Sequence, residues 1–205
     1  MCTRYYIEAE TREIKDIIAQ AKESLLYQRF IEIGEPVLTS GEIRPTDVVA
    51  VIAPNRDGRQ TVFPMRWGFQ FLGRSPLVNA RTETAAEKAA FKEAWAKHRC
   101  IIPASWYYEW EHLVSNTGKK KAGAKYMIQP KNSNMTWLCG LYRMEDGLPA
   151  FAVLTRDPAG ELCKIHDRMP LIFPQDKIGA WIDPNTKPEE LLQYALTDMV
   201  FEKAV

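Results

Sequence analysis

The amino-acid sequence predicts an α+β fold: a single domain, residues 1–205, with a curved, largely antiparallel, barrel-like sheet flanked by helices. Short apolar segments outnumber helical ones and follow one another as hairpins, the pattern of an antiparallel sheet. The chain has 205 residues, of which 46% are hydrophobic, enough for one full core. We find no repeat, low-complexity tract or linker that would divide it.

The first and second helices are predicted from spacing and capping signals. Residues 1–8 alternate loosely and predict a short strand, after which residues 10–30 place apolar side chains at helical spacing. Thr84–Glu87 has the pattern of a capping box and begins an alanine-rich second helix that ends at His98. Near the C-terminus we expect a helix through Trp181 and a final one over Lys187–Leu196.

The other apolar segments are short and bounded by turn residues, so each predicts a strand. Pro64 indicates an edge or a bulge in the second of them. In chain order the predicted strands are Val48–Ala53, Thr61–Phe69, Arg99–Ile102, Trp106–Trp110, Tyr126–Gln129, Met135–Tyr142, Phe151–Thr155 and Leu171–Phe173.

Composition excludes several classes of protein. With 27 basic and 26 acidic residues the net charge is +1, so any contact with nucleic acid would use a local group of arginines. No apolar run reaches the roughly 18–20 residues of a membrane helix, and the charged N-terminus is unlike a signal peptide. The four cysteines form no CxxC pair and the three histidines lack ligand spacing. We therefore expect a cytoplasmic monomer with reduced thiols, no metal and no other cofactor.

Cys2 is the first candidate site residue. Removal of Met1 would make Cys2 the N-terminus and place its α-amine beside its thiol. In model peptides the amine titrates at about 7.7–8.0 and the thiol at about 8.5, so both nucleophiles are partly available near neutral pH. An amine attacks an aldehyde to form an imine, and a neighbouring thiol can then close a thiazolidine ring. The alternative is that Cys2 belongs to a frayed terminus.

Three polar residues interrupt an otherwise ordinary core pattern. Asn79 precedes the second helix and is either a turn residue or a site residue. Glu109 shares a strand face with Tyr107, where its carboxylate is desolvated with a raised pKa, paired with a cation, or exposed at a sheet edge. His166 is the best candidate for an acid/base, because imidazole titrates near neutral pH, although a single histidine is more often structural.

Further residues suit a ligand that carries phosphate groups. Trp67, beside Gly68, either offers a ring for stacking or packs in the core, and Arg81 is either a phosphate ligand or a surface charge. The run Lys119–Lys121 lies in a glycine-rich hairpin loop, which favours a solvated turn over a nucleic-acid patch. An aminothiol, an amide, a carboxylate, an imidazole, arginines and flat aromatics together suit a reaction at a carbonyl attached to phosphates.

Six motifs match a known family in family order. They are Met1–Arg4, Arg66–Gly68, Asn79–Thr84, Arg99–Ala104, Tyr108–Trp110 and Ile165–Pro170. On these motifs the chain resembles the SOS response-associated peptidase (SRAP) family, whose members sense abasic sites in single-stranded DNA. The resemblance implies one α+β domain whose curved sheet forms a positively charged groove for single-stranded DNA.

The resemblance also implies a role for each matched residue. Cys2 would attack the ring-opened aldehyde of an abasic site and form a thiazolidine crosslink, with Asn79 orienting the Cys2 end and the sugar. Glu109 would manage the proton of the α-amine, and His166 would act as acid/base in opening the deoxyribose and in reversing the link. The implied DNA contacts are Arg4, Arg81 and Arg168 on phosphates, and Trp67 and Trp110 on flanking nucleotides.

The expected function is thus covalent capture of abasic sites, with an AP-lyase activity through the imine as an accompanying expectation. The sequence departs from the family at Thr3, where glycine is usual, and at Gly41–Pro45, which replaces a Tyr-Asn-x-Ala-Pro segment and adds Arg44. Two other functions stay open. One is a cysteine peptidase that uses Cys2 and processes its own N-terminus, and the other is a non-covalent binding module for single-stranded or modified DNA.

Overall fold

The computed structural model describes residues 2–71, 73–114 and 120–204. Met1, part of the glycine- and lysine-rich loop expected over 118–123, and Lys119 of the lysine run lie outside these residues.

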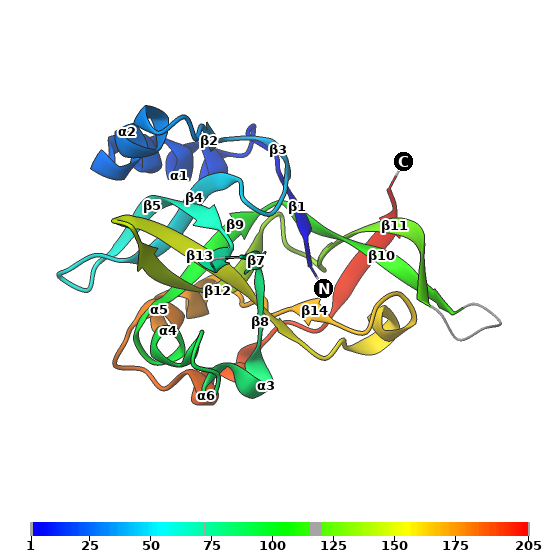
Figure 1. The fold of residues 1–205 in the computed structure, drawn as a ribbon. Coiled ribbons are helices and arrows are strands. Elements are labelled where there is room, and N and C mark those ends of the chain that lie inside the picture. The colour runs from blue at the N-terminus through cyan, green and yellow to red at the C-terminus, as the bar shows by residue number, and fades with distance from the viewer. Residues whose placement is uncertain (1, 72, 115–119, 205) are drawn as a thin grey trace.

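A closed barrel of five strands forms the centre of the fold (Figure 1). Its order is β12-β9-β4-β5-β13, and pairing of β12 with β13 closes it. Neighbouring strands are antiparallel except β5 and β13. The predicted curved, largely antiparallel sheet is confirmed. The barrel strands are β4 (Val48–Pro54), β5 (Gln60–Trp67), β9 (Arg99–Ala104), β12 (Thr136–Glu145) and β13 (Leu148–Arg156).

β4 is buried along nearly its whole length rather than at alternate residues. Its continuous apolar run follows from burial on both faces, because the barrel interior lies on one side and two helices cover the other (Figure 1). Pro64 of β5 pairs with Ala50 of β4, at a point that β13 does not reach, since β13 pairs with β5 only at Arg66 and Trp67. The missing N–H of this proline therefore removes no hydrogen bond to β13.

Both long predicted helices are divided in the structure. The first is α1 (Arg12–Glu23) and α2 (Leu25–Glu32), separated at Ser24, whose backbone is extended and whose hydroxyl accepts a hydrogen bond from the Leu26 N–H at 3.3 Å. The second is α3 (Thr82–Ala85) and α4 (Lys92–Lys97). Between these two, Phe91 turns into the core and lies 5.7 Å from the ring of Phe69, so tertiary packing outweighs the helix propensity of the alanines.

A second sheet lies beside the barrel and carries the N-terminus (Figure 1). All its neighbouring strands are antiparallel. In spatial order they are β15 (Met199–Lys203), β11 (Lys120–Pro130), β10 (Trp106–Val114), β1 (Arg4–Ile7) and β3 (Gly41–Ile43). β10 is an interior strand, so the alternative that Glu109 is exposed at a sheet edge is wrong. The sequence did not predict β3 or β15.

Short elements complete the fold. Ile172 of the predicted strand 171–173 makes only a single bridge, to Leu138, and the predicted final helix is divided into α6 and η3. α4, α5 and α6 lie on the opposite side of the barrel from α1 and α2 (Figure 1). The helical elements are η1 (Gly160–Lys164), η2 (Gln175–Lys177), α5 (Ile178–Ile182), α6 (Pro188–Leu191) and η3 (Leu192–Tyr194). The strands are β2 (Val37–Leu38), β6 (Phe69–Phe71), β7 (Arg74–Leu77), β8 (Asn79–Arg81) and β14 (Met169–Pro170). In the described part of the chain, no helix has the length and apolarity needed to cross a bilayer.

Candidate active site

Cys2 is fully buried and lies two residues before the start of β1. Its thiol donates to the Arg4 carbonyl oxygen, at an Sγ–O distance of 3.7 Å. Burial raises the pKa of this thiol far above its ordinary value, and the charge of nearby Glu109 raises it further. Cys2 is thus a protonated thiol inside the molecule, so the alternative of a frayed terminus is wrong for this residue.

Asn79 contacts the backbone of Cys2. β8 runs parallel to β13 with Asn79 opposite Val153, and the indole N–H of Trp67 donates to the carbonyl oxygen of the preceding Val78 at 2.9 Å. From this fixed position, Asn79 Nδ2 donates to the Cys2 carbonyl oxygen at 2.8 Å. Asn79 Oδ1 is buried and has no hydrogen-bond partner among the described residues, so it offers a strong acceptor to a ligand.

Glu109 is a buried acid. It lies on β10 and is 3% exposed. Burial raises the pKa of its carboxyl from an ordinary 4.5 to about 7. Of the three alternatives that the sequence left open, exposure at a sheet edge is wrong, and burial gives this carboxyl the raised pKa of the desolvated alternative. A group with this pKa can both accept and release a proton near neutral pH.

His166 lies beside Glu109, with 3.5 Å between its Nε2 and Glu109 Oε2. Its segment is tied to β10 because the His112 backbone N–H donates to the Ile165 carbonyl oxygen at 2.8 Å. The Arg168 backbone N–H donates to His166 Nδ1 at 3.0 Å, so a neutral ring carries its proton on Nε2, which faces Glu109. Burial lowers the pKa of His166 to about 4, so the imidazole is neutral at pH 7.

Two further residues join this cluster that sequence reasoning did not name as site residues. The ring centroid of His112 lies 3.8 Å from that of His166. Asp167 Oδ1 lies 3.1 Å from His166 Nδ1 and 3.6 Å from His112 Nδ1. Asp167 could have been found from the sequence, because it lies within the motif Ile165–Pro170. His112 could not, because alternation along β10 predicts that its side chain lies on the face away from Glu109. The two histidines meet because β1 pairs with β10 only as far as Tyr108, and the segment around Ile165 lies along the edge left free.

Among the described residues, His112, His166 and Asp167 are the group that could hold a metal ion, since their ligand atoms lie within 4.8 Å of one another. The Nδ1 lone pair of His166 already accepts the Arg168 N–H, so a metal at that atom would replace this hydrogen bond. The observed contacts suit proton transfer better than metal ligation.

Two residues expected to contact DNA are engaged within the fold. Arg168 is 9% exposed, and its guanidinium donates to both carboxylate oxygens of Glu83 at 2.9 Å and to Asp157 Oδ1 at 2.5 Å. Trp67 is fully buried, with its ring 6.0 Å from that of Phe151. Neither side chain is free for a nucleotide, so we leave both out of the proposed DNA contacts. Arg168 instead anchors the segment that carries the site imidazole, and Trp67 supports the strand that carries the site amide.

The other three expected contacts are accessible. Arg4 is half-buried on β1 and forms an ion pair with Glu42 at 3.2 Å. Arg81 is exposed at the end of β8, and no carboxylate of the described residues lies within ion-pair distance of it. Trp110 is partly exposed on β10. The structure therefore separates a buried group around Cys2 from accessible cationic and aromatic side chains.

Relatives of the chain carry a common description. The SOS response associated peptidase (SRAP) family profile matches residues 1–204. The chain is 34% identical over 181 residues to abasic site processing protein YoaM of Bacillus subtilis, covering 78% of this chain and 77% of YoaM. It is 30% identical over 216 residues to abasic site processing protein YobE of the same bacterium, covering 97% and 92%. Abasic site processing protein YedK of Escherichia coli is 26% identical over 206 residues, covering 98% and 87%.

Solved structures share the fold. A protein from Bacteroides thetaiotaomicron gives a TM-score of 0.71 at 21% identity, covering 100% of this chain and 92% of that chain. A phage-related protein from Bordetella bronchiseptica also gives 0.71 at 21% identity, covering 99% and 94%. Because the family profile spans nearly every residue and relatives reach 34% identity, the chain belongs to the SOS response associated peptidase (SRAP) family.

Proposed function

We propose that this protein processes abasic sites in DNA, and that Cys2, once Met1 is removed, captures the aldehyde of an abasic site in single-stranded DNA as a thiazolidine. The observation that carries the proposal is the gathering of Asn79, Glu109 and His166 around a buried Cys2. The substrate class is supported by relatives that are named abasic site processing proteins.

Formation of an imine is the first step. The α-amine of Cys2 must be neutral to attack the aldehyde carbon, and an α-amine ordinarily titrates at about 7.7–8.0. The pKa of Glu109, about 7, is close enough for its carboxylate to take the proton of the ammonium. The N–C bond forms, the former carbonyl oxygen receives in turn two protons that Glu109 relays from the amine nitrogen, and water leaves as the C=N bond forms.

Closure of the ring by sulfur is the second step. The Cys2 sulfur adds to the imine carbon, forming an S–C bond, while the thiol proton ends on the nitrogen. The complete sequence releases one water and needs no oxidant. Because burial raises the thiol pKa, the sulfur is not a free thiolate at neutral pH, and the amine reacts first.

His166 acts on the sugar. An abasic deoxyribose is mostly a closed hemiacetal, and opening it requires loss of the C1′ hydroxyl proton and protonation of the ring oxygen. The neutral imidazole of His166 and the carboxyl of Glu109, 3.5 Å apart, form an acid/base pair for this exchange. From the imine, removal of a C2′ proton would expel the 3′ phosphate and incise the strand; closure of the thiazolidine consumes the imine and suppresses this lyase reaction.

Recognition of the strand comes from accessible groups. Arg4 and Arg81 bind phosphates without reading sequence, and Trp110 stacks on a flanking base. An abasic site has no base edge to read, so the aldehyde and the vacant space beside it provide the selectivity.

A peptidase that uses Cys2 fits the structure less well. Cysteine peptidases rely on a thiolate whose pKa is lowered by a cationic neighbour. Here burial and the charge of Glu109 raise the thiol pKa, and burial keeps His166 neutral. A carbonyl reaction begun by an amine does not need a thiolate.

The test is adduct formation with a labelled oligonucleotide that contains one abasic site. Protein with Met1 removed should give a band of reduced mobility on a denaturing gel, and an oligonucleotide without the abasic site should give none. A variant with one residue added before Cys2 keeps the thiol and blocks the α-amine, so it should also give none. If processed protein forms no adduct, or if the extended variant forms it equally well, the proposal fails.

A further inference from the structure

One face of the second sheet gathers aromatic and charged side chains. Register determines which residues share it: Arg4 lies opposite Tyr108, and Trp110 lies opposite Lys125. Glu42 lies opposite Tyr6 in the neighbouring pair of strands. Because alternate residues of a strand point to one face and paired residues share a face, this face lies opposite the one that carries Glu109. Its members are Arg4, Tyr6, Glu42, Trp106, Tyr108, Trp110 and Lys125.

Glu42 is the centre of the charges on this face. Its carboxylate forms ion pairs with Lys125 Nζ at 2.5 Å, Arg4 Nε at 3.2 Å and Arg44 Nε at 3.4 Å. Burial alone would raise the Glu42 pKa, but the hydrogen bond from Lys125 and the charges of Arg44 and Arg4 outweigh it and hold the pKa below its ordinary value. Three cations thus surround one anion, and the group keeps a net positive charge.

Aromatic rings adjoin these cations. Lys125 Nζ lies 3.8 Å from the ring centroid of Tyr108 and 5.5 Å from that of Trp110. Tyr6 and Trp106 stack with their centroids 4.6 Å apart and their planes 3° from parallel. Cations interleaved with flat rings are the composition of surfaces that bind single-stranded nucleic acid.

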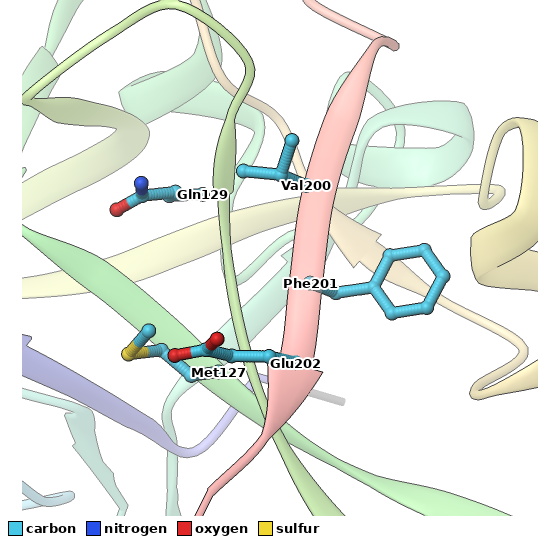
Figure 2. Close-up of a pocket in the computed structure, with 5 residues that line it drawn as sticks. All are labelled: Met127, Gln129, Val200, Phe201 and Glu202. Atoms are coloured by element: carbon cyan, nitrogen blue, oxygen red, sulfur yellow. The ribbon is translucent and has the colours of Figure 1, made fainter.

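The face continues toward the free edge of the sheet at β15. Figure 2 shows Met127, Gln129 and Glu202 projecting to one side of β11 and β15, whereas Phe201 projects to the other. Met127 lies opposite Tyr108, and Glu202 opposite Met127, so the shallow pocket in the figure extends the same face. A strand several nucleotides long could therefore follow this surface beyond Glu42.

We propose that Glu42 is an internal competitor for a backbone phosphate of single-stranded DNA at the Arg4–Arg44–Lys125 cluster. A carboxylate and a phosphodiester each carry one negative charge and accept the same donors, so the two exclude each other. The phosphate therefore binds only when Glu42 gives up its ion pairs, and intact strands bind weakly. Weak binding lets the protein leave undamaged DNA, while a strand held by the covalent link stays. The ligand in this inference rests on the proposed function.

The experiment measures binding of a fluorescent oligothymidine without any abasic site, by anisotropy, over a series of salt concentrations. Glu42→Gln should bind about 3–10-fold tighter at low salt, and its plot of log affinity against log salt should be steeper by roughly the 0.7 expected for one more phosphate contact. Glu42→Ala should change binding in the same direction. Glu190→Gln removes an exposed carboxylate on α6 and is the matched control, for which we expect less than about a twofold change.

Unchanged or weaker binding by Glu42→Gln would overturn the inference, because Glu42 would then only orient the cations. Equal tightening by Glu190→Gln would overturn it too, because net charge would explain the effect. The proposed function is judged separately, by adduct formation with the abasic strand. If Glu42→Gln binds the intact strand more tightly but no adduct forms with the abasic strand, the inference about Glu42 holds and the covalent chemistry is refuted. If the adduct forms but Glu42→Gln does not change binding, the covalent chemistry holds and the inference about Glu42 is refuted.

Discussion

Glu109→Gln is predicted to stabilise the fold above pH 7 while it impairs covalent capture. Glutamine keeps the size of the side chain but has no proton to lose. Because burial raises the pKa of Glu109 from 4.5 to about 7, the folded state holds this proton over a pH range in which the unfolded chain has released it. Stability that the protonated carboxyl provides is complete below pH 4.5 and is lost as pH rises through about 7.

The size of the effect follows from the same pKa. At 1.36 kcal/mol for each pKa unit, the rise from 4.5 to about 7 corresponds to a loss of about 3 kcal/mol between pH 4.5 and pH 8. His166 acts in the opposite direction, since its pKa falls from 6.5 to about 4 and its contribution is lost as pH falls through that range. The two effects offset each other in the parent chain at intermediate pH, so the difference between variant and parent is the quantity to measure.

The assay is urea unfolding of parent and Glu109→Gln at pH 4.5, 6 and 8, with Glu190→Gln as the control for loss of an acidic group. The advantage of Glu109→Gln in unfolding free energy should grow by about 3 kcal/mol from pH 4.5 to pH 8. The same variant should lose most of its rate of adduct formation. If the difference in unfolding free energy between Glu109→Gln and the parent varies by less than about 0.5 kcal/mol over this pH range, burial does not raise the Glu109 pKa as described.

Three further substitutions test the neighbouring contacts. Asn79→Ala removes the donor to the Cys2 carbonyl oxygen and should slow adduct formation about 10–100-fold, while it lowers the free energy of unfolding in urea by only about 1 kcal/mol. If the rate falls only as far as the fraction of folded protein falls, the role of Asn79 is purely structural. Arg168→Lys cannot reproduce the two-pronged contact with Glu83 and should lower the unfolding free energy by about 1–3 kcal/mol, whereas no change would contradict the observed pairing. The charge of His112 helps to lower the His166 pKa, so His112→Gln should raise the His166 pKa, as measured by NMR titration of the ring proton; an unchanged His166 pKa would show that the two rings are not electrostatically coupled.

The residues of the candidate site could be named from the sequence because they lie in local motifs with recognisable chemistry, and their roles stay predictions. Cys2, Asn79, Glu109 and His166 were all named, and the structure brings Asn79 to Cys2 and His166 to Glu109. The strand pattern gave the fold class, since period-two alternation and turn residues are local signals.

What the sequence could not supply depends on contacts between distant segments. His112 contacts His166 because β1 pairs with β10 only as far as Tyr108, which leaves the edge of β10 beyond that residue free. No local sequence pattern predicts where the pairing between two strands ends. Trp67 and Arg168 resemble ligand contacts in sequence, yet one is buried in the core and the other is held by carboxylates. Ser24 divides a predicted helix, because its hydroxyl accepts a hydrogen bond from the Leu26 N–H and begins a new helix. The apolar residues keep helical spacing on both sides of Ser24, so spacing alone predicts one continuous helix.

The measurement that tests the central claim most directly compares the mass of adducts formed by processed parent protein and by Cys2→Ala, with and without borohydride. The parent should give, without reductant, a denaturation-resistant species whose mass is the sum of protein and abasic strand less one water. Cys2→Ala keeps an α-amine but has no sulfur to close the ring, so its imine should survive denaturation only after reduction. A stable unreduced adduct of Cys2→Ala, or none from the parent, would contradict the assignment of Cys2 as the residue that closes the link.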